Sequence, residues 1–341
     1  MMTLEQPLKR LSESQVPFIN QILEGDNLEF IRNIPKNTID LVITSPPYFQ
    51  QRDYGKGMGN EKNIDDYLEH LTTLFHECVR VTKDEGSIIF NIGDKYKKSS
   101  LMLIPYRFAL KILETESVML VNNITWIKSN PVPRQFQRRL VNSTEPFFHF
   151  VKSNKYYYNL KLFKESKIIQ KTQKNDTHIG QKYFELIEKS SLTDFQKQQA
   201  RKELVETINL IKDGKISGLR MKIKGIHALP FGGQQGGRLT HLRTKGFTII
   251  KINGDSIKKD IIESPVETIK GNIHPAVYPE NIIAEFIKLL TKENGIVLDP
   301  FVGSGTSAVA AKKLKRKFIG FEINSKYLKY ANDRLNKIAE T

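Results

Sequence analysis

Short apolar runs alternate with amphipathic segments along most of this 341-residue chain. The runs LVIT at 41–44, SIIFN at 87–91 and IVLD at 296–299 suit strands that are covered on both faces. Between the first two, residues 66–86 place apolar side chains at helical spacing, and this helix is expected to end at Gly86. Strands that alternate with helices in this way predict a doubly wound α/β sheet.

The alternation stops near residue 152 and resumes near residue 272. We therefore expect residues 18–151 and 272–335 to form two parts of one sheet, with 152–271 as an insertion between them. Inside the insertion, Thr193 and Gln196 have the spacing of a capping box at the start of a long helix. The glycine-rich residues 225–247 are expected to form a long loop.

Basic residues are concentrated in this insertion. The whole chain has 53 Lys and Arg against 37 Asp and Glu, a net charge of +16. Residues 152–271 hold 20 Lys and 4 Arg against 12 Asp and Glu, a net charge of +12. Such a basic segment predicts a polyanionic partner. The candidates for contact with it are Arg238, His241 and Arg243 in the glycine-rich segment, and Lys197 and Arg201 on the long helix.

Several other classes of protein are disfavoured by composition. The single cysteine, Cys78, excludes a disulfide framework and a cysteine-rich zinc site, and the histidines lack the spacing of metal ligands. No run of about 18 apolar residues is present, and the first residues lack the apolar core of a secretory signal. We expect a cytoplasmic protein without a metal site.

A glycine-rich turn follows the apolar run at 296–299. Gly303 and Gly305 lie between this strand and a helix, where backbone N–H groups are free to meet a ligand. Glu322, at the end of the next strand, is suited to bind ribose hydroxyls. Asp299 would repel phosphate but suits a cationic amino group, as in the methionine part of S-adenosylmethionine. This pattern predicts a nucleoside cofactor of that kind.

Three motifs together resemble the amino-group DNA methyltransferases. These are DLVITSPPY at 40–48, DPFVGSGTSAVAA at 299–311 and the acid in FEIN at 321–324. The S-P-P-Y sequence resembles the cytosine-N4 branch of that family. The motif order, with the catalytic motif first, then a basic recognition region and then the cofactor loop, is similar to the circularly permuted beta group. The resemblance covers the sheet-forming parts and leaves the insertion unmatched.

The resemblance implies a Rossmann-like, circularly permuted methyltransferase fold with a target-recognition insertion, and S-adenosylmethionine as cofactor. It also implies roles for individual residues. The catalytic tetrapeptide corresponds to Ser45, Pro46, Pro47 and Tyr48. The cofactor-binding positions correspond to Asp26, His274, Pro275, Asp299, Pro300, Phe301, Gly303, Ser304, Gly305, Thr306 and Glu322.

The proposed chemistry needs hydrogen-bond acceptors beside an exocyclic amine, whose lone pair is delocalised into the ring. The Ser45 hydroxyl and the Pro46 carbonyl would favour a tetrahedral nitrogen and free its lone pair for in-line attack on a methyl group. Tyr48 offers an aromatic face for a base extruded from the duplex. Carbon-5 methylation is set aside, because Cys78 has the neighbours of a core residue.

We therefore expect a site-specific methyltransferase that modifies cytosine N4 in duplex DNA, in a restriction-modification system with a cognate endonuclease as its counterpart. Adenine-N6 methylation with the same machinery is the alternative, although Ser45 stands where adenine enzymes typically have Asp or Asn. A DNA-binding protein of this fold without catalysis, and an RNA substrate, are further alternatives. The sequence leaves the recognition site and the oligomeric state open.

Overall fold

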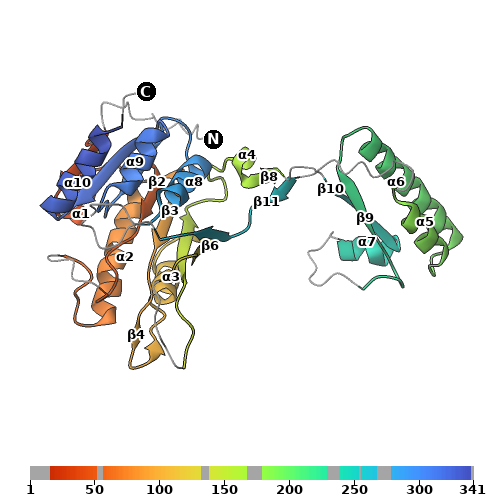
Figure 1. The fold of residues 1–341 in the computed structure, drawn as a ribbon, viewed down its shortest axis with the longest axis horizontal. Coiled ribbons are helices and arrows are strands. Elements are labelled where there is room, and N and C mark those ends of the chain that lie inside the picture. Colours follow the sequence, from red (N-terminus) through yellow and green to blue (C-terminus); the bar gives the residue numbers. More distant parts are fainter. Residues whose placement is uncertain are drawn as a thin grey trace, which may run out of the picture. The chain divides into compact units, whose positions relative to one another are not determined.

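The computed structural model describes residues 16–51, 57–131, 138–166, 179–228, 238–252, 255–266 and 278–338. The chain divides into two compact units (Figure 1). Met1–Phe163 and Lys259–Thr341 form the sheet unit, and Lys164–Lys258 form the insertion unit. The insertion unit lies within the range 152–271 that the sequence marks as an insertion.

An eight-stranded sheet forms the centre of the sheet unit, in the order β1, β14, β13, β2, β3, β7, β6, β12. The first five strands in this order are parallel, β7 is antiparallel to both of its neighbours, and β12 is parallel to β6. The strands are β1 Gln21–Glu24, β2 Ile39–Thr44, β3 Thr82–Asn91, β6 Met119–Lys128, β7 Thr144–Val151, β12 Ile261–Ser264, β13 Ile296–Asp299 and β14 Lys317–Glu322. One edge, here called the carboxyl edge, therefore holds the carboxyl end of every strand except β7, which contributes its amino end.

Helices cover both faces of this sheet, as buried parallel strands require. One apolar cluster joins the sheet to α1 Asn27–Arg32, α2 Ile64–Val81 and α3 Ile104–Thr115, and a second joins it to α8 Glu280–Leu290, α9 Thr306–Lys313 and α10 Ser325–Asn336. Val42 belongs to the first cluster, whereas Leu41 and Ile43 belong to the second, because successive side chains of a strand point to opposite faces. The short α4 Leu160–Phe163 and the hairpin of β4 Tyr96–Lys97 and β5 Ser100–Leu101 complete this unit. The predicted α/β sheet is confirmed.

A buried histidine lies in the middle of the sheet. His149 on β7 is 1% exposed, and its Nε2 lies 2.9 Å from the hydroxyl of Ser87 on β3. Burial lowers the pKa of His149 to about 3. The unfolded chain binds a proton on this ring below about pH 6.5, whereas the folded protein does not until about pH 3. The neutral imidazole therefore contributes stability that is complete above pH 6.5 and is lost as the pH falls.

This difference in protonation predicts an acid-sensitive sheet. Between pH 7.5 and pH 5, the free energy of unfolding should fall by about 2 kcal/mol more in the wild type than in His149→Gln, which has no ring to protonate. Urea denaturation at the two pH values measures this difference. His241→Gln, a change at an exposed histidine, should keep the wild-type dependence. An equal fall in the wild type and in His149→Gln would contradict the prediction.

The insertion unit has a core of its own. It contains α5 Gln181–Glu188, α6 Asp194–Lys212, β9 Gly218–Ile223, α7 Arg238–Thr244 and β10 Phe247–Ile252, with β9 antiparallel to β10. The apolar cluster of this core contains Tyr183, Ile187, Leu192, Ala200, Leu204, Ile208, Met221, Ile223 and Phe247. The expected capping box at the start of α6 is confirmed, since Thr193 and Gln196 bond reciprocally. A second pair, β8 Lys164–Ser166 and β11 Asp255–Ile257, forms where the chain leaves and rejoins the sheet unit.

Two local expectations are wrong. Helix α2 ends at Val81 instead of Gly86, because Thr82 adopts an extended conformation and begins β3. A Cβ at Gly86 would lie 3.0 Å from the Asp40 carbonyl oxygen, so this glycine serves close packing of β3 against β2. In the segment expected to be a loop, residues 238–244 form helix α7, which buries Leu242. Residues 229–237 of that segment lie outside the described part of the chain.

Candidate active site

The S-P-P-Y tetrapeptide and the glycine-rich turn meet at the carboxyl edge. Strand β13 pairs with β2 in register, with Val297 opposite Leu41 and Leu298 opposite Val42. At the ends of these strands, the Thr44 hydroxyl donates a hydrogen bond of 2.6 Å to Oδ1 of Asp299. This bond joins two residues that are 255 positions apart in the chain, and Ser45 directly follows Thr44.

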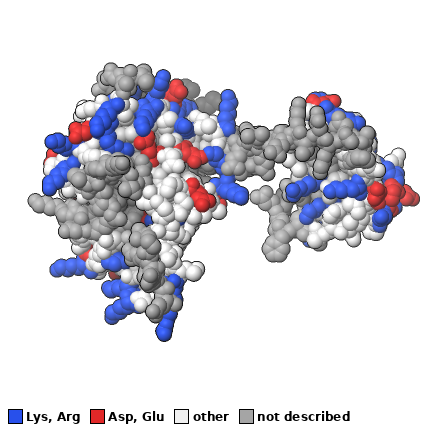
Figure 2. All heavy atoms as spheres, in the orientation of Figure 1, with Lys and Arg blue, Asp and Glu red and all other residues white. Residues whose placement is uncertain are grey.

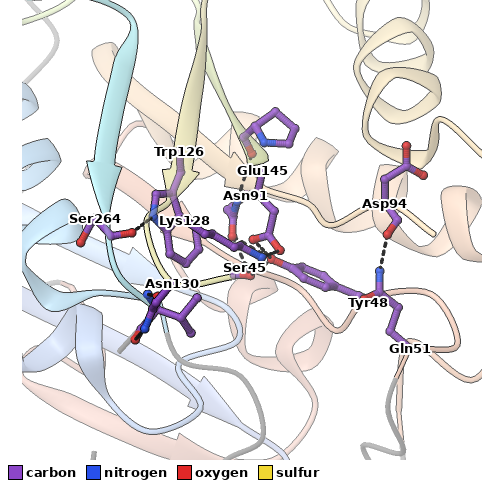
Figure 3. Close-up of polar contacts among 12 residues, drawn as sticks. Ser45, Tyr48, Gln51, Asn91, Asp94, Trp126, Lys128, Asn130, Glu145 and Ser264 are labelled. Atoms are coloured by element: carbon purple, nitrogen blue, oxygen red, sulfur yellow. Dashed lines mark hydrogen bonds and ion pairs between the residues drawn. The ribbon is translucent and has the colours of Figure 1, made fainter. Parts of the chain in front are cut away.

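The side chains of Ser45 and Tyr48 converge on two polar residues from neighbouring strands (Figure 3). Ser45 Oγ lies 3.2 Å from the Tyr48 hydroxyl and 3.3 Å from Oδ1 of Asn91, which ends β3. The Tyr48 hydroxyl lies 2.8 Å from the same Asn91 oxygen and 3.0 Å from Oε2 of Glu145 on β7. The Pro47 carbonyl accepts a hydrogen bond of 2.9 Å from Tyr67 on α2. The tetrapeptide is therefore held by groups from β3, β7 and α2.

The Tyr48 ring is packed against a glycine. A Cβ added at Gly93, just beyond β3, would lie 2.4 Å from two carbon atoms of the Tyr48 ring. Asp94, the next residue, accepts backbone hydrogen bonds from Lys95 and from Ile104 at the start of α3. Gly93 thus leaves room for the Tyr48 ring, and Asp94 shapes the turn after β3.

Gly93→Ala should displace the Tyr48 ring. Because the added methyl group would overlap the ring, we expect the rate of the reaction at this site to fall about 10²-fold, with a loss of stability of about 1–3 kcal/mol. Single-turnover kinetics and thermal melting measure the two effects. Gly218→Ala is the matched control, since a Cβ there meets no atom closer than 3.8 Å. Full activity in Gly93→Ala would show that the ring position is unimportant.

Asp299 holds the glycine-rich turn together from inside. Its carboxylate is 1% exposed and accepts four hydrogen bonds. Oδ1 binds the Thr44 hydroxyl and the Phe301 N–H, and Oδ2 binds the hydroxyls of Ser307 (2.6 Å) and Tyr278 (2.9 Å). Burial raises the pKa of Asp299, while the hydrogen bonds from Ser307 and Thr44 oppose that rise. The carboxylate thus fastens β2, the turn and α9 to one another.

The two glycines of the turn have different roles. Gly303 has a φ of 52°, and its N–H donates a hydrogen bond of 3.0 Å to Oε2 of Glu322. Gly305 has a φ of 85°, and a Cβ there would lie 2.8 Å from Cβ of Ala331 on α10. At Gly305 the close neighbour is therefore a helix of the protein itself, and not only a ligand as the sequence suggested.

The hydroxyl groups of the turn face a basic residue on α10. Arg334 donates to the Ser304 carbonyl (2.7 Å) and to Oγ1 of Thr306 (3.1 Å). Ser304 and Thr306 are buried, and Pro300 accepts a hydrogen bond from Asn27 on α1. These contacts fasten the turn after β13 to α1 and α10.

Glu322 and Asp26 lie at the ends of neighbouring strands. Glu24 pairs with Glu322 in the parallel register of β1 and β14, and the Gly25 N–H donates to the Glu322 carbonyl. Asp26 caps α1 by accepting from the N–H groups of Leu28 and Glu29. The Glu322 carboxylate accepts from the N–H groups of Gly303 and Asn324, and burial raises its pKa. A carboxylate has about four acceptor positions, so Glu322 can still bind ligand hydroxyls.

His274 and Pro275 lie outside the described residues. Within the described ranges, no group of three or more His, Cys, Asp or Glu could hold a metal ion. Cys78 is fully buried on α2, and burial raises the pKa of its thiol above the usual range. The same part of the chain contains no helix of the length and apolarity needed to cross a membrane.

The N6/N4 family model, described as DNA methylase, matches residues 39–333 of the chain. The chain belongs to the N6/N4 DNA methylase family. It is accordingly a DNA amino-methyltransferase, and the match spans the catalytic motif, the insertion and the glycine-rich turn.

Individual DNA methyltransferases are similar to this methylase over most of its length. Type II methyltransferase M.SfiI of Streptomyces fimbriatus is 27% identical, with 89% of this chain and 88% of that protein covered. M.SmaI of Serratia marcescens is 25% identical, with 92% and 90% covered. The solved PvuII DNA methyltransferase (cytosine-N4-specific) superposes with a TM-score of 0.60 at 17% identity over 94% of this chain and 88% of that one. This likeness confirms a Rossmann-like methyltransferase fold.

The expected DNA-contact residues of the methylase all lie in the insertion unit. His241 and Arg243 are exposed on α7, whose first residue is Arg238. On α6, Arg201 is exposed and Lys197 is partly buried. Both bind Glu188 of α5, Lys197 at the carbonyl and Arg201 at the carboxylate. Figure 2 shows Lys and Arg side chains on the drawn face of both units. The structure thus places the three candidates of the glycine-rich segment on one short helix and the other two beside an acidic residue.

Several residues at the carboxyl edge of the methylase were missed from the sequence. They are Thr44, Asn91, Lys128, Glu145, Tyr278 and Ser307. Asn91 could have been found, because it ends an apolar run as Ser45 does. Glu145 could not, since it is the second residue of its strand, and only the antiparallel direction of β7 brings it to this edge.

Proposed function

We propose that this methylase transfers the methyl group of S-adenosylmethionine to the exocyclic N4 amine of a cytosine in duplex DNA. The observation that carries the proposal is the hydrogen bond between Thr44 and Asp299. Because Ser45 follows Thr44, this bond places the tetrapeptide directly beside the glycine-rich turn. A methyl donor held by the turn and an amine held by the tetrapeptide would therefore be neighbours.

The residues around the turn fit S-adenosylmethionine. Glu322 offers carboxylate oxygens to the ribose hydroxyls, and Asp26 lies at the end of the neighbouring strand. Asp299 acts by holding the turn in shape, because its own oxygens already accept four bonds. Two solved structures of this fold are named as S-adenosylmethionine complexes, those of M1.HpyAVI and of TTHA0409 from Thermus thermophilus. When bound, this cofactor supplies an electrophilic methyl group.

Ser45 and Pro46 would orient and activate the amine. The Ser45 hydroxyl and the Pro46 carbonyl accept its two hydrogens, which draws the nitrogen towards a tetrahedral geometry. Tyr48 presents a ring face to the extruded base, with Gly93 packed against the ring. Serine at position 45 favours cytosine, and adenine N6 is the competing target because it carries the same kind of amine.

A restriction-modification role is part of the proposal. The relatives named Type II methyltransferases support it, and a cognate endonuclease of the same site is the expected counterpart. The insertion unit, with Arg238, His241, Arg243, Lys197 and Arg201, would contact the duplex and read the sequence.

The identity of the modified nucleoside tests the proposal. Unmethylated duplex DNA is incubated with the purified protein and labelled S-adenosylmethionine, then digested to nucleosides for mass spectrometry. We expect N4-methylcytosine. N6-methyladenine alone would show that the target is adenine, and no transfer would favour a DNA-binding protein without catalysis. Competition with RNA tests the nature of the substrate.

Glu322→Ala should weaken cofactor binding. Loss of hydrogen bonds to a charged group costs about 1.5–3 kcal/mol, so the Kd for S-adenosylmethionine should rise roughly 10-fold to 100-fold. The maximal rate at saturating cofactor should change little. Isothermal titration calorimetry measures the Kd. Glu293→Ala, at an exposed acid near the amino end of β13, is the control. An unchanged Kd in Glu322→Ala would refute the ribose role.

A further inference from the structure

A chain of hydrogen bonds leads away from Ser45 to a carboxylate. Ser45 Oγ lies 3.2 Å from the Tyr48 hydroxyl, which in turn lies 3.0 Å from Oε2 of Glu145. The other oxygen of Glu145, Oε1, forms an ion pair with Lys128 on β6. Figure 3 shows these side chains meeting from the loop after β2 and from strands β6 and β7. Glu145 is therefore a charged acceptor two hydrogen bonds from the proposed catalytic hydroxyl.

Among the described residues, the hydrogen bonds through Tyr48 form the path that leads from Ser45 to a carboxylate. The Glu145 side chain is 13% exposed and the Lys128 side chain 20%, so water has limited access to the pair. Asn91 contacts both Ser45 and Tyr48, but its side-chain amide cannot take up a proton as a carboxylate can. The nearby acid Asp94 instead uses Oδ1 to bind two backbone N–H groups.

Lys128 is itself held in place. Its Nζ lies 5.1 Å from the centre of the Trp126 ring, and the Trp126 indole N–H donates a hydrogen bond of 2.9 Å to the Ser264 carbonyl on β12. The Trp126 indole thus supports the cation that pairs with Glu145.

We infer that Glu145 is the terminal acceptor of the proton that the amine releases, reached through Ser45 and Tyr48. The inference rests on the proposed function, because methylation of an amine must release a proton. As the N–CH3 bond forms and the S–CH3 bond of the sulfonium donor breaks, the nitrogen becomes cationic. Its proton passes to Ser45 Oγ, the Ser45 proton to the Tyr48 oxygen, and the Tyr48 proton to Oε2 of Glu145. Glu145 is then neutral and later releases the proton to water.

The proposed proton relay predicts the single-turnover rates of single and double variants. Glu145→Gln keeps the size and a hydrogen-bond acceptor but removes the base, so the single-turnover rate on long unmethylated duplex DNA should fall about 10²-fold. Tyr48→Phe breaks the same path, so its single-turnover rate should fall by a similar factor. The double variant should be no slower than the slower single variant, because both changes interrupt one path. Glu263→Gln, at an exposed acid on the neighbouring β12, should retain the wild-type rate.

The pH profile separates proton transfer from simple positioning. Among the described residues, the titratable groups that contact Glu145 are Lys128 on β6 and Tyr48 after β2, whereas Asn91 on β3 donates to the carbonyl of the next residue, Pro146. The wild-type rate should fall at acid pH if a base accepts the proton, and Glu145→Gln should be slow and lack that fall. If Glu145 only positioned Tyr48, glutamine at this position would restore the rate. If Glu145→Gln melts early, Lys128→Met with Glu145→Gln removes both charges and is measured in its place.

The outcomes distinguish the relay from the proposed function. If the wild type transfers methyl groups and Glu145→Gln is as fast, or if the losses in Glu145→Gln and Tyr48→Phe multiply in the double variant, the relay is refuted and the function stands. If the wild type transfers no methyl group to DNA, the proposed function fails, and the relay that rests on it fails with it.

Discussion

Ser45→Ala should lower kcat about 10²-fold to 10³-fold while leaving the Kd for S-adenosylmethionine nearly unchanged. The hydroxyl contacts Tyr48 and Asn91 and would accept a hydrogen from the amine only as the nitrogen becomes tetrahedral. Interactions made only in the transition state affect turnover and not ground-state binding. Single-turnover methyl transfer gives the rate, and calorimetry gives the Kd.

The control for this experiment is another serine of the sheet unit. Ser100→Ala, at an exposed position on the β4–β5 hairpin, should have wild-type kinetics. A large rise in the Kd of Ser45→Ala with little change in kcat would contradict the assignment, because it would place Ser45 in the cofactor site. The ratio of the two effects is thus more informative than the loss of activity alone.

Asp299→Ala should destabilise the sheet unit more than other single changes at the cofactor turn. Its carboxylate accepts from Thr44, Phe301, Ser307 and Tyr278, and its removal leaves buried donors without their acceptor. Relief of the cost of burying a charge offsets part of this loss, so we expect a net change of about 3 kcal/mol. For a unit of this size the melting temperature should fall by roughly 6–12 °C.

Thermal melting with and without S-adenosylmethionine measures this effect. Asp299→Asn retains one oxygen and should lose less stability than Asp299→Ala. Asp333→Ala, at an exposed position on α10, should melt as the wild type does. An unchanged melting temperature in Asp299→Ala would mean that the four hydrogen bonds do not hold the turn.

Local sequence patterns predicted most of the sheet. Runs such as LVIT and IVLD allow little other than buried strands, and the helices between them have clear apolar faces. The end of α2 was missed because TKDE gives no apolar signal, so β3 appeared to begin only after Gly86. Helix α7 was missed because its glycine-rich flank indicated a loop, whereas burial of Leu242 stabilises a helix there. Tertiary packing decided both segments.

The candidate site could be predicted where residues follow parallel strands. Ser45, Asp299 and Glu322 all lie at the ends of such strands, and the parallel order brings them to one edge. Glu145 and Lys128 depend on the pairing of β7 with β3 and β6, which no local pattern specifies. Nothing in the sequence indicated that Asp299 is fully engaged by the protein, since its four donors come from several separate segments of the chain.

The paired strands β8 and β11 have a consequence for redesign. In their register Ile257 lies opposite Lys164, so the points where the chain leaves and rejoins the sheet unit are about one strand spacing apart. The insertion unit carries its own core, and a replacement module needs only two ends at that separation. We expect that the insertion unit can be replaced, between Phe163 and Lys259, by the corresponding unit of a related protein. If the insertion unit reads the DNA sequence as proposed, such a chimera would methylate a different sequence.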